Sequence, residues 1–360
     1  MLDATAVQAH GGMLHEELSR LGLAPEAVLD VSVNVNPYGP CPSVLEAIRS
    51  ARIERYPDPT AAPARAALAA WLDVAVDRVV VGNGAVDLLW SLARCRVGPG
   101  DTVLIVEPAF SELRSAAGRV GARVVEHRLE PGDDFRLDLD ALDAALRRER
   151  PRLAYVCTPA NPTGRSVPID ALARLSCAHR ETTLIVDLSF ASLSADYQHD
   201  ACRASDRIVW LRSLTKDLAL AGLRVGFAVA PAHVARAIES SRPPWSVNAL
   251  AQAAAIAATE PRAQVFVAES RARLLADRQR HDLGLRRLGL RVHPSETLYT
   301  LVDLGPERSA TALRDGMLAR HAVLVRDGTS FGLPHHLRLC ARPPPETARM
   351  LLALEREVGR

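Results

Sequence analysis

Short apolar runs alternate with helical patterns through residues 79–216, and this alternation constrains the fold more than any other feature. Four of these runs have the length and composition of buried strands: 102–106, 153–157, 183–186 and 208–211. Strands that alternate with helices favour a mostly parallel sheet with helices on both faces. In such sheets, ligands bind beside the carboxyl ends of the strands. We therefore predict an α/β fold with its chemistry at the strand ends.

The pattern changes after Pro243-Pro244-Trp245. Two long helical patterns, 249–258 and 264–288, are followed by short strands and a closing helix, which indicates a smaller α+β domain. The chain is therefore predicted to have three parts: an N-terminal segment 1–40, a large domain 41–245 and a small C-terminal domain 246–360.

The composition argues against several classes of protein. The chain has 360 residues, of which 48% are hydrophobic and 24% are charged, as in ordinary soluble globular proteins. A net charge of +2 gives no electrostatic basis for binding nucleic acid or an anionic membrane, and no apolar run is long enough to span a bilayer. The six cysteines are scattered and no signal peptide is evident, so we expect reduced thiols, a cytoplasmic location and no metal site.

Polar residues stand where three of the predicted strands end. Asn161, Asp187 and Lys216 each follow a strand, and the carboxyl ends of parallel strands share one edge of the sheet. Each residue alone has an ordinary explanation, because asparagine and aspartate cap turns and most lysines are solvated surface charges. Their joint position at one predicted edge favours a shared ligand site.

The sequence around Lys216 offers groups for binding a phosphorylated aldehyde. The lysine amine could form an imine with the aldehyde, while nearby hydroxyls, an arginine and a glycine turn before a helix could hold the phosphate. These are the needs of pyridoxal 5'-phosphate (PLP), with Asp187 at the pyridine nitrogen and Asn161 at the ring hydroxyl. Phe110 could stack on the ring or be a core residue, and Arg224 could equally be a surface arginine. The candidate phosphate and stacking residues are Gly84, Ala85, Ser213, Thr215, Arg224 and Phe110.

Four features together resemble the fold-type I PLP enzymes of the aminotransferase superfamily. They are Asn161-Pro162-Thr163-Gly164, Asp187, Ser213-Leu214-Thr215-Lys216 and Arg224. The resemblance covers nearly the whole chain. It implies a large PLP-binding domain with a mostly parallel sheet and a smaller α+β C-terminal domain.

Other motifs are similar to two neighbouring families of that superfamily. Asn36-Pro37-Tyr38-Gly39-Pro40 and Arg55-Tyr56-Pro57-Asp58-Pro59 resemble histidinol-phosphate aminotransferases. His10-Gly11-Gly12 and Pro244-Trp245-Ser246-Val247-Asn248 look more like threonine-phosphate decarboxylase of cobalamin biosynthesis. The motifs are specific for the cofactor and the fold but not for the substrate.

The resemblance also implies roles for residues outside the strand ends. Tyr56 would reach the cofactor phosphate of a neighbouring subunit, so the active unit would be a homodimer. Arg338 would bind a substrate carboxylate, a task that suits a planar bidentate donor. Arg326 and His10 would face the far end of the substrate, with an ordinary turn histidine as the alternative for His10. Asn34 and Asn36, which alternate with valines, could face a ligand or cap a turn, and Asn36 is the candidate for substrate binding.

One motif departs from the family pattern. Many relatives carry Asp-Glu-Ala-Tyr or Asp-Glu-Ala-Phe where this chain has Asp187-Leu188-Ser189-Phe190, and Phe190 cannot donate a hydrogen bond to the ring oxygen. We therefore expect an enzyme similar to threonine-phosphate decarboxylase that acts on an α-amino acid. It could also be a relative recruited to antibiotic metabolism, where it would decarboxylate, deaminate or cleave a cysteine conjugate. The alternatives are an aminotransferase of the histidinol-phosphate type and a non-catalytic binding protein with this fold.

Overall fold

The computed structural model describes residues 10–359, and its largest element is a seven-stranded sheet of order β2-β8-β7-β6-β5-β3-β4. Strands β3 to β7 pair in parallel, and β8 runs antiparallel to both β2 and β7. The predicted mostly parallel sheet is therefore confirmed, and the antiparallel β8 was not predicted. The strands are β2 (Val79–Gly82), β3 (Thr102–Glu107), β4 (Arg123–Arg128), β5 (Leu153–Cys157), β6 (Thr183–Asp187), β7 (Ile208–Ser213) and β8 (Gly226–Val229).

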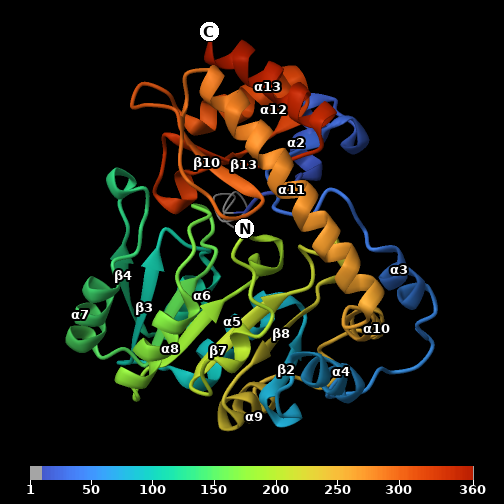
Figure 1. Ribbon diagram of the computed structural model, residues 1–360, viewed down its shortest axis with the longest axis vertical. Helices are drawn as coiled ribbons and strands as arrows, with labels where there is room; N and C mark the ends of the chain where they lie inside the picture. The colour runs from blue at the N-terminus through green and yellow to red at the C-terminus, as the bar shows by residue number, and fades with distance from the viewer. Residues whose placement is uncertain (1–9, 360) are drawn as a thin grey trace.

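Alternate residues of the central strands bury apolar side chains on opposite faces of this sheet. On β3, Val103 and Ile105 join one hydrophobic cluster, while Leu104 and Val106 join another. Helices α5, α6 and α9 cover the first face, and α4, α7 and α8 cover the second (Figure 1). These helices are α4 (Ala62–Leu72), α5 (Gly84–Arg96), α6 (Glu112–Arg119), α7 (Leu139–Glu149), α8 (Ile169–Ala178) and α9 (Ala232–Ser240).

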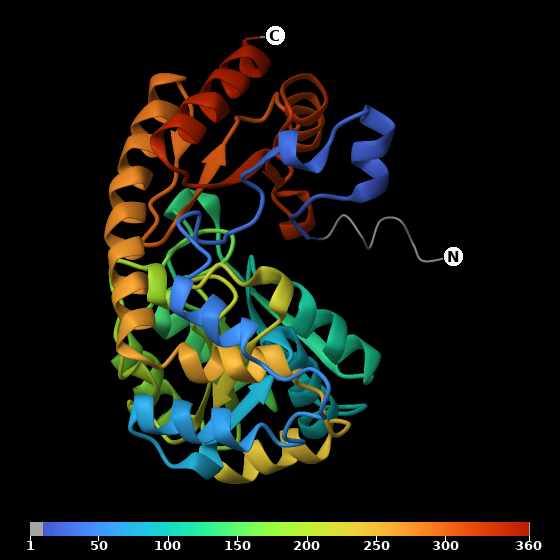
Figure 2. The same ribbon diagram turned by 90° about the vertical axis from the view of Figure 1, so that its right-hand side faces the viewer.

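The C-terminal part contains a separate four-stranded antiparallel sheet of order β12-β13-β10-β9, called the small sheet below. A short parallel pair joins β1 (Leu29–Asp30) to β11 (Val323–Leu324), so the N-terminal segment packs against the C-terminal part, as Figure 2 shows. The strands of the small sheet are β9 (Arg291–Val292), β10 (Tyr299–Asp303), β12 (Arg326–Asp327) and β13 (His336–Cys340). The three-part domain division stays a prediction.

The long helix α11 extends from the large sheet to the small one (Figures 1 and 2). It begins at Pro261, where proline is favoured because the first helical amide needs no partner. The remaining helices are α2 (His15–Leu21), α3 (Pro42–Arg49), α10 (Ala249–Ala257), α11 (Pro261–Arg287), α12 (Ala310–His321) and α13 (Pro344–Val358). Within residues 10–359, no helix combines the length and apolar character needed to cross a membrane.

Candidate active site

A cavity of about 430 Å³ opens where the carboxyl ends of β5, β6 and β7 face the small sheet. Asn161, Asp187 and Lys216 line it from the large sheet, and Arg326 and Arg338 line it from β12 and β13. Asp187 is the last residue of β6, while Asn161 and Lys216 follow β5 and β7. The strand-end residues singled out in the sequence therefore meet in one cavity.

Lys216 has an unusually acidic ammonium group. Burial, with the nearby charges of Arg224 and Arg338, lowers its pKa to about 8, and the opposing effect of Asp187 is smaller. Its backbone carbonyl accepts a hydrogen bond from the amide of Asn36 at 2.9 Å, which fixes the start of the side chain. A lysine with a lowered pKa supplies the neutral amine that attacks a carbonyl carbon.

The carboxylate of Asp187 is buried and held from two sides. Oδ2 accepts a hydrogen bond from the Tyr155 hydroxyl at 2.7 Å, and Oδ1 accepts one from the Ser189 amide at 2.9 Å. Burial raises the pKa of Asp187 although both hydrogen bonds oppose it. A protonated pyridine nitrogen beside this carboxylate would stabilise its charged form. Sequence reasoning missed Tyr155, because a tyrosine inside a fully buried strand looks like an ordinary core residue.

Backbone and hydroxyl groups form an anion cradle at one end of the cavity. The Ser213 and Thr215 hydroxyls lie 2.7 Å apart, and Ala85 belongs to the first turn of α5, where amides point outward. A Cβ added to Gly84 would lie 2.8 Å from the Arg224 guanidinium, and one added to Gly226 would lie 2.7 Å from the Ala85 amide nitrogen. The two glycines therefore permit a close approach that larger residues would block.

These groups fit the chemistry of PLP. The lysine could hold the aldehyde, the buried carboxylate could hold the ring nitrogen, and the cradle could hold the phosphate. Phe110 lines the same cavity and could stack on the ring. The residues that would hold PLP come from separate strands and helices but line one cavity.

Arg338 and Arg326 form a second cationic end of the cavity, apart from the cradle around Arg224. Arg338 is 6% exposed, donates to the Asn161 side chain and the Ser32 carbonyl, and lies 5.7 Å from the centre of the Tyr299 ring. No carboxylate in residues 10–359 forms a salt bridge with Arg338, and its Nε has no partner. Burial lowers its pKa to about 10, so it stays charged at neutral pH. A buried cation without a counter-ion favours an anionic ligand.

The second arginine of this end is equally buried. Arg326 is 5% exposed, donates to the Ser330 hydroxyl and lies 5.2 Å from the centre of the Phe331 ring. In the sheet it pairs directly with Arg338, so the two guanidinium groups come from neighbouring strands. Both arginines that were predicted at the substrate end thus line the cavity.

His10 and Phe110 line the cavity together. The His10 Nε2 lies 2.8 Å from the Glu112 carboxylate, and its ring centre lies 5.4 Å from that of Phe110. Glu112 also accepts a hydrogen bond from the Trp90 indole at 2.6 Å. Glu112, two residues after Phe110, lines the cavity too.

Asn34 and Asn36, both considered as ligand-facing residues, take different roles in the structure. The Asn36 amide donates to the Asp217 carbonyl at 2.8 Å, its side-chain oxygen accepts from the Tyr38 amide at 3.0 Å, and it does not line the cavity. Asn34 does line it, is 3% exposed, and has no partner for either polar atom. The Asn36 side chain is used in hydrogen bonds to backbone groups, so Asn34 is the asparagine that can face a ligand.

Tyr56 lies outside this cavity. It is 83% exposed, and its ring centre is 5.0 Å from that of Trp245. The role predicted for Tyr56 concerns a neighbouring subunit and stays a prediction.

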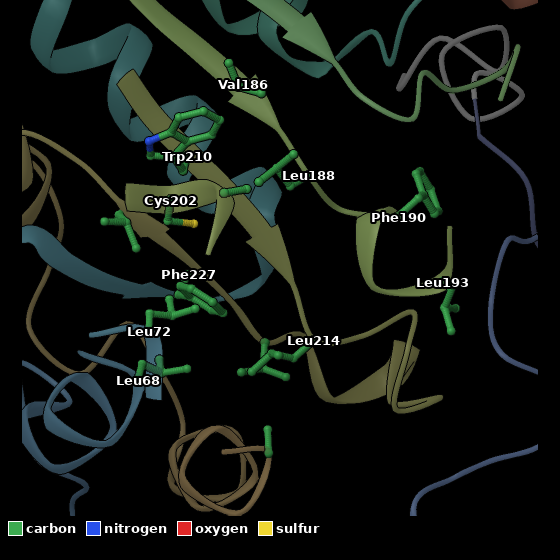
Figure 3. Close-up of a cluster of buried hydrophobic side chains, with 14 of the residues drawn as sticks. Leu68, Leu72, Val186, Leu188, Phe190, Leu193, Cys202, Trp210, Leu214 and Phe227 are labelled. Carbon is green, nitrogen blue, oxygen red and sulfur yellow. The ribbon is translucent and has the colours of Figure 1, made fainter. Parts of the chain in front are cut away.

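The departures at residues 188 and 190 have a packing explanation. Leu188 points into the apolar cluster with Val186 and Trp210, whereas Phe190 lies farther along, near Leu193 (Figure 3). The Phe190 ring packs edge-on against Tyr299 at 5.0 Å and lines the cavity. Neither position carries a polar group that could reach a cofactor.

Sequence comparisons place these features among known enzymes. The family model described as aminotransferase class I and II matches residues 26–355. Histidinol-phosphate aminotransferase 2 from Ralstonia nicotianae is 34% identical over 359 residues, which cover 98% of this chain and 94% of the relative. Histidinol-phosphate aminotransferase from Symbiobacterium thermophilum is 33% identical over 342 residues, covering 92% of this chain and 91% of the relative.

Solved structures give a consistent result. The crystal structure of histidinol-phosphate aminotransferase from Sinorhizobium meliloti in complex with PLP superposes with a TM-score of 0.87 at 25% identity, covering 99% of this chain and 98% of the other. L-threonine-O-3-phosphate decarboxylase from Porphyromonas gingivalis superposes with a TM-score of 0.81 at 26% identity, covering 92% of this chain and 100% of the other.

Proposed function

The chain belongs to the aminotransferase class I and II family, with PLP as its cofactor, and from that premise we propose an aminotransferase of the histidinol-phosphate type. One observation carries the proposal: a single cavity has an anion cradle around Arg224, a lysine of lowered pKa, and a second cationic end at Arg326 and Arg338. Such a cavity suits an amine that carries its own anionic group, because the second end would bind that group while the lysine acts on the amine.

Each residue has a definite task in this proposal. Bound PLP supplies a ring that withdraws electrons from the substrate carbon next to the amine. Asp187, held by Tyr155, would keep the ring nitrogen protonated, and Asn161 would donate to the ring hydroxyl. Lys216 would hold the cofactor aldehyde and would serve as the general base and acid at the reacting carbon.

The substrate end is assigned by charge. Arg338 and Arg326 bind the phosphate or carboxylate of the substrate, and Asn34, whose buried amide has no protein partner, donates to the same anion. His10 and Glu112 line the outer part of the cavity, where the imidazole of histidinol phosphate would extend.

A decarboxylase acting on threonine phosphate is a second candidate. Phe190 favours it, because an apolar ring there leaves no hydroxyl beside the cofactor ring oxygen. Two arginines at one end also suit a substrate that carries both a phosphate and a carboxylate. Recruitment to a cysteine conjugate remains a variant of this candidate.

The two candidates differ in their products. The holoprotein would be incubated with L-histidinol phosphate and 2-oxoglutarate, and separately with L-threonine O-3-phosphate. Glutamate formation from the first mixture is the expected result, and carbon dioxide release from the second would favour the decarboxylase instead. Lys216→Ala serves as the inactive control. If neither substrate reacts while cysteine conjugates do, both phosphate-based proposals are wrong.

We further propose that the active unit is a homodimer in a reducing, cytoplasmic environment. Ile53, Tyr56 and Trp245 are large, exposed and apolar, and Tyr56 and Trp245 line one shallow pocket with Leu250. Exposed apolar surface of this kind marks an interaction site. All six cysteines are free, which suits a reducing compartment. Light scattering coupled to size exclusion would measure the mass, and Tyr56→Ala together with Trp245→Ala should weaken the dimer.

A further inference from the structure

Three side chains with metal-binding chemistry meet on one face of the small sheet, away from the lysine. His293 follows β9, Asp303 ends β10 and His336 begins β13. One ligand atom from each lies within 4.8 Å of the others. Asp303 stands directly opposite His336, and the His293 amide donates to the Leu301 carbonyl at 3.0 Å, so the strand register brings all three to the same face.

Three of the four histidine ring nitrogens of this cluster have no hydrogen-bond partner among residues 10–359. His293 is 1% exposed and His336 is 7% exposed, yet His293 Nε2 and both ring nitrogens of His336 make no hydrogen bond. The rings stack at 5.5 Å, and the Phe135 ring packs edge-on against both. Buried polar atoms are normally satisfied, so three unpaired nitrogens on two adjacent histidines indicate a missing ligand.

The hydrogen bonding of the His293 ring suits metal binding. Asp134 lies 2.8 Å from His293 Nδ1 and 3.2 Å from the Arg291 guanidinium. A carboxylate that accepts from Nδ1–H leaves Nε2 as the unprotonated nitrogen, which is the usual arrangement behind a metal-bound histidine.

We propose that His293, Asp303 and His336 bind one divalent transition-metal ion of the zinc class, with Asp134 orienting His293. Two imidazoles and one carboxylate form a known three-ligand set for Zn²⁺, whose fourth position is taken by water. Bonds of about 2.0–2.2 Å separate tetrahedral ligand atoms by roughly 3.3–3.5 Å, so small side-chain rotations close the cluster on the ion.

The position of the site indicates what the ion would do. Asp134 lies in the turn after β4 of the large sheet, whereas Asp303 and His336 belong to the small sheet and His293 directly follows its strand β9. On β13, His336 and Arg338 are two residues apart and share a face. The Phe331 ring, which lines the active-site cavity, belongs to a small apolar cluster with Phe135. The ion would therefore fix the His293 ring, whose hydrogen bond to Asp134 joins the small sheet to the large one beside the cationic end of the cavity.

Metal titration of the purified, full-length, PLP-loaded protein tests this. After chelator treatment and its removal, Zn²⁺ would be titrated calorimetrically, and Co²⁺ would be added as a spectroscopic probe of tetrahedral geometry. We expect one ion per chain, a tetrahedral Co²⁺ spectrum and a higher thermal midpoint. His293→Gln and His336→Gln should each lose the site, and Asp134→Asn should weaken it by about 10- to 100-fold. His233→Gln, at an exposed position of α9, is the matched control and should bind like the natural protein.

A fourth variant covers the case in which a histidine variant does not fold. Asp303→Asn keeps an oxygen that can accept from the Gly305 amide, a bond of 2.8 Å, while removing the anionic ligand. It should bind Zn²⁺ at least tenfold more weakly with an unchanged circular dichroism spectrum. The double variant His293→Gln/His336→Gln gives the background from cofactor and thiols. Stoichiometry of the natural protein no higher than that background, or full binding by Asp303→Asn, would overturn the proposal.

Discussion

The two ends of the active-site cavity are built differently. At the cofactor end, Asp187, Ser213 and Lys216 stand at the ends of adjacent parallel strands, and the Asp187 carboxylate and Ser213 hydroxyl have protein partners. At the substrate end, Arg338 and Asn34 come from distant segments and keep buried polar atoms without partners. A satisfied, strand-borne end suits a permanent cofactor, whereas an unsatisfied end suits a ligand that enters and leaves.

The sharpest test of this difference removes the covalent anchor of the cofactor end. Lys216→Ala should lower turnover by roughly 10⁴- to 10⁶-fold, the range seen when a nucleophile is lost. Borohydride reduction followed by mass spectrometry should find no cofactor attached to the chain. Arg338→Ala, from the other end, should keep its attached cofactor. If Lys216→Ala still carried reducible cofactor, another amine would be the anchor and the division between the two ends would fail.

The next largest effect is expected at the substrate end. Arg338→Ala should raise KM for the phosphorylated substrate by about ten- to several-hundred-fold, because a hydrogen bond to a charged group contributes about 1.5–3 kcal/mol and each decade corresponds to about 1.4 kcal/mol. Its affinity for PLP, measured by equilibrium dialysis, should not change. Arg338→Lys should recover only part of the loss, since the paired donors are gone.

A matched control separates this effect from damage to the sheet. Arg342 follows β13, donates to the Asp30 carbonyl and does not line the cavity. Arg342→Ala should therefore leave KM near that of the natural protein. Equal KM values for the two alanine variants would show that Arg338 is structural.

The same contrast explains what could be predicted from the sequence. The predictions of the fold class, the superfamily and the cofactor are confirmed. They could be made because the cofactor residues stand in short local motifs that directly follow predicted strands. The main expectation about activity, a decarboxylase, is less well supported than its alternative, an aminotransferase. Motif similarity identifies the cofactor end, while the reaction depends on the angle at which the other end holds the substrate.

Other features depend on contacts that no local pattern contains. In the sequence Tyr155 looks like a core residue, and only the structure shows that its hydroxyl donates a hydrogen bond to Asp187. Asn34 and Asn36 are two residues apart and look alike in the sequence. Only the folded turn shows that Asn36 hydrogen-bonds to the backbone while the Asn34 side chain has no partner. The pair His293 and His336 has no metal-binding spacing in the sequence, because antiparallel pairing brings the two residues together through β10.

A pH experiment links the two ends. The pKa of Lys216 is lowered from 10.5 to about 8 by burial and by Arg224 and Arg338, so the amine loses its proton at lower pH than an ordinary lysine. The rate of PLP uptake by the cofactor-free protein should rise about tenfold between pH 7 and pH 9, because the neutral amine is the nucleophile. Stopped-flow absorbance would measure it. In Arg338→Ala the midpoint should move to higher pH, since one repelling charge is gone; an unchanged midpoint would mean that the ends are electrostatically independent.

The smallest effect is expected from Tyr155, which acts on the cofactor only through Asp187. Tyr155→Phe removes a hydroxyl 2.7 Å from Oδ2, while the Ser189 amide still holds Oδ1. One hydrogen bond of this kind contributes about 0.5–1.5 kcal/mol, so kcat and PLP affinity should fall by about two- to tenfold. Tyr38→Phe is the matched control, because that hydroxyl bonds the Asp277 carboxylate outside the cavity. Tyr155→Phe should leave KM for the phosphorylated substrate unchanged, opposite to Arg338→Ala. A rise in KM with constant kcat would instead assign Tyr155 to the substrate end.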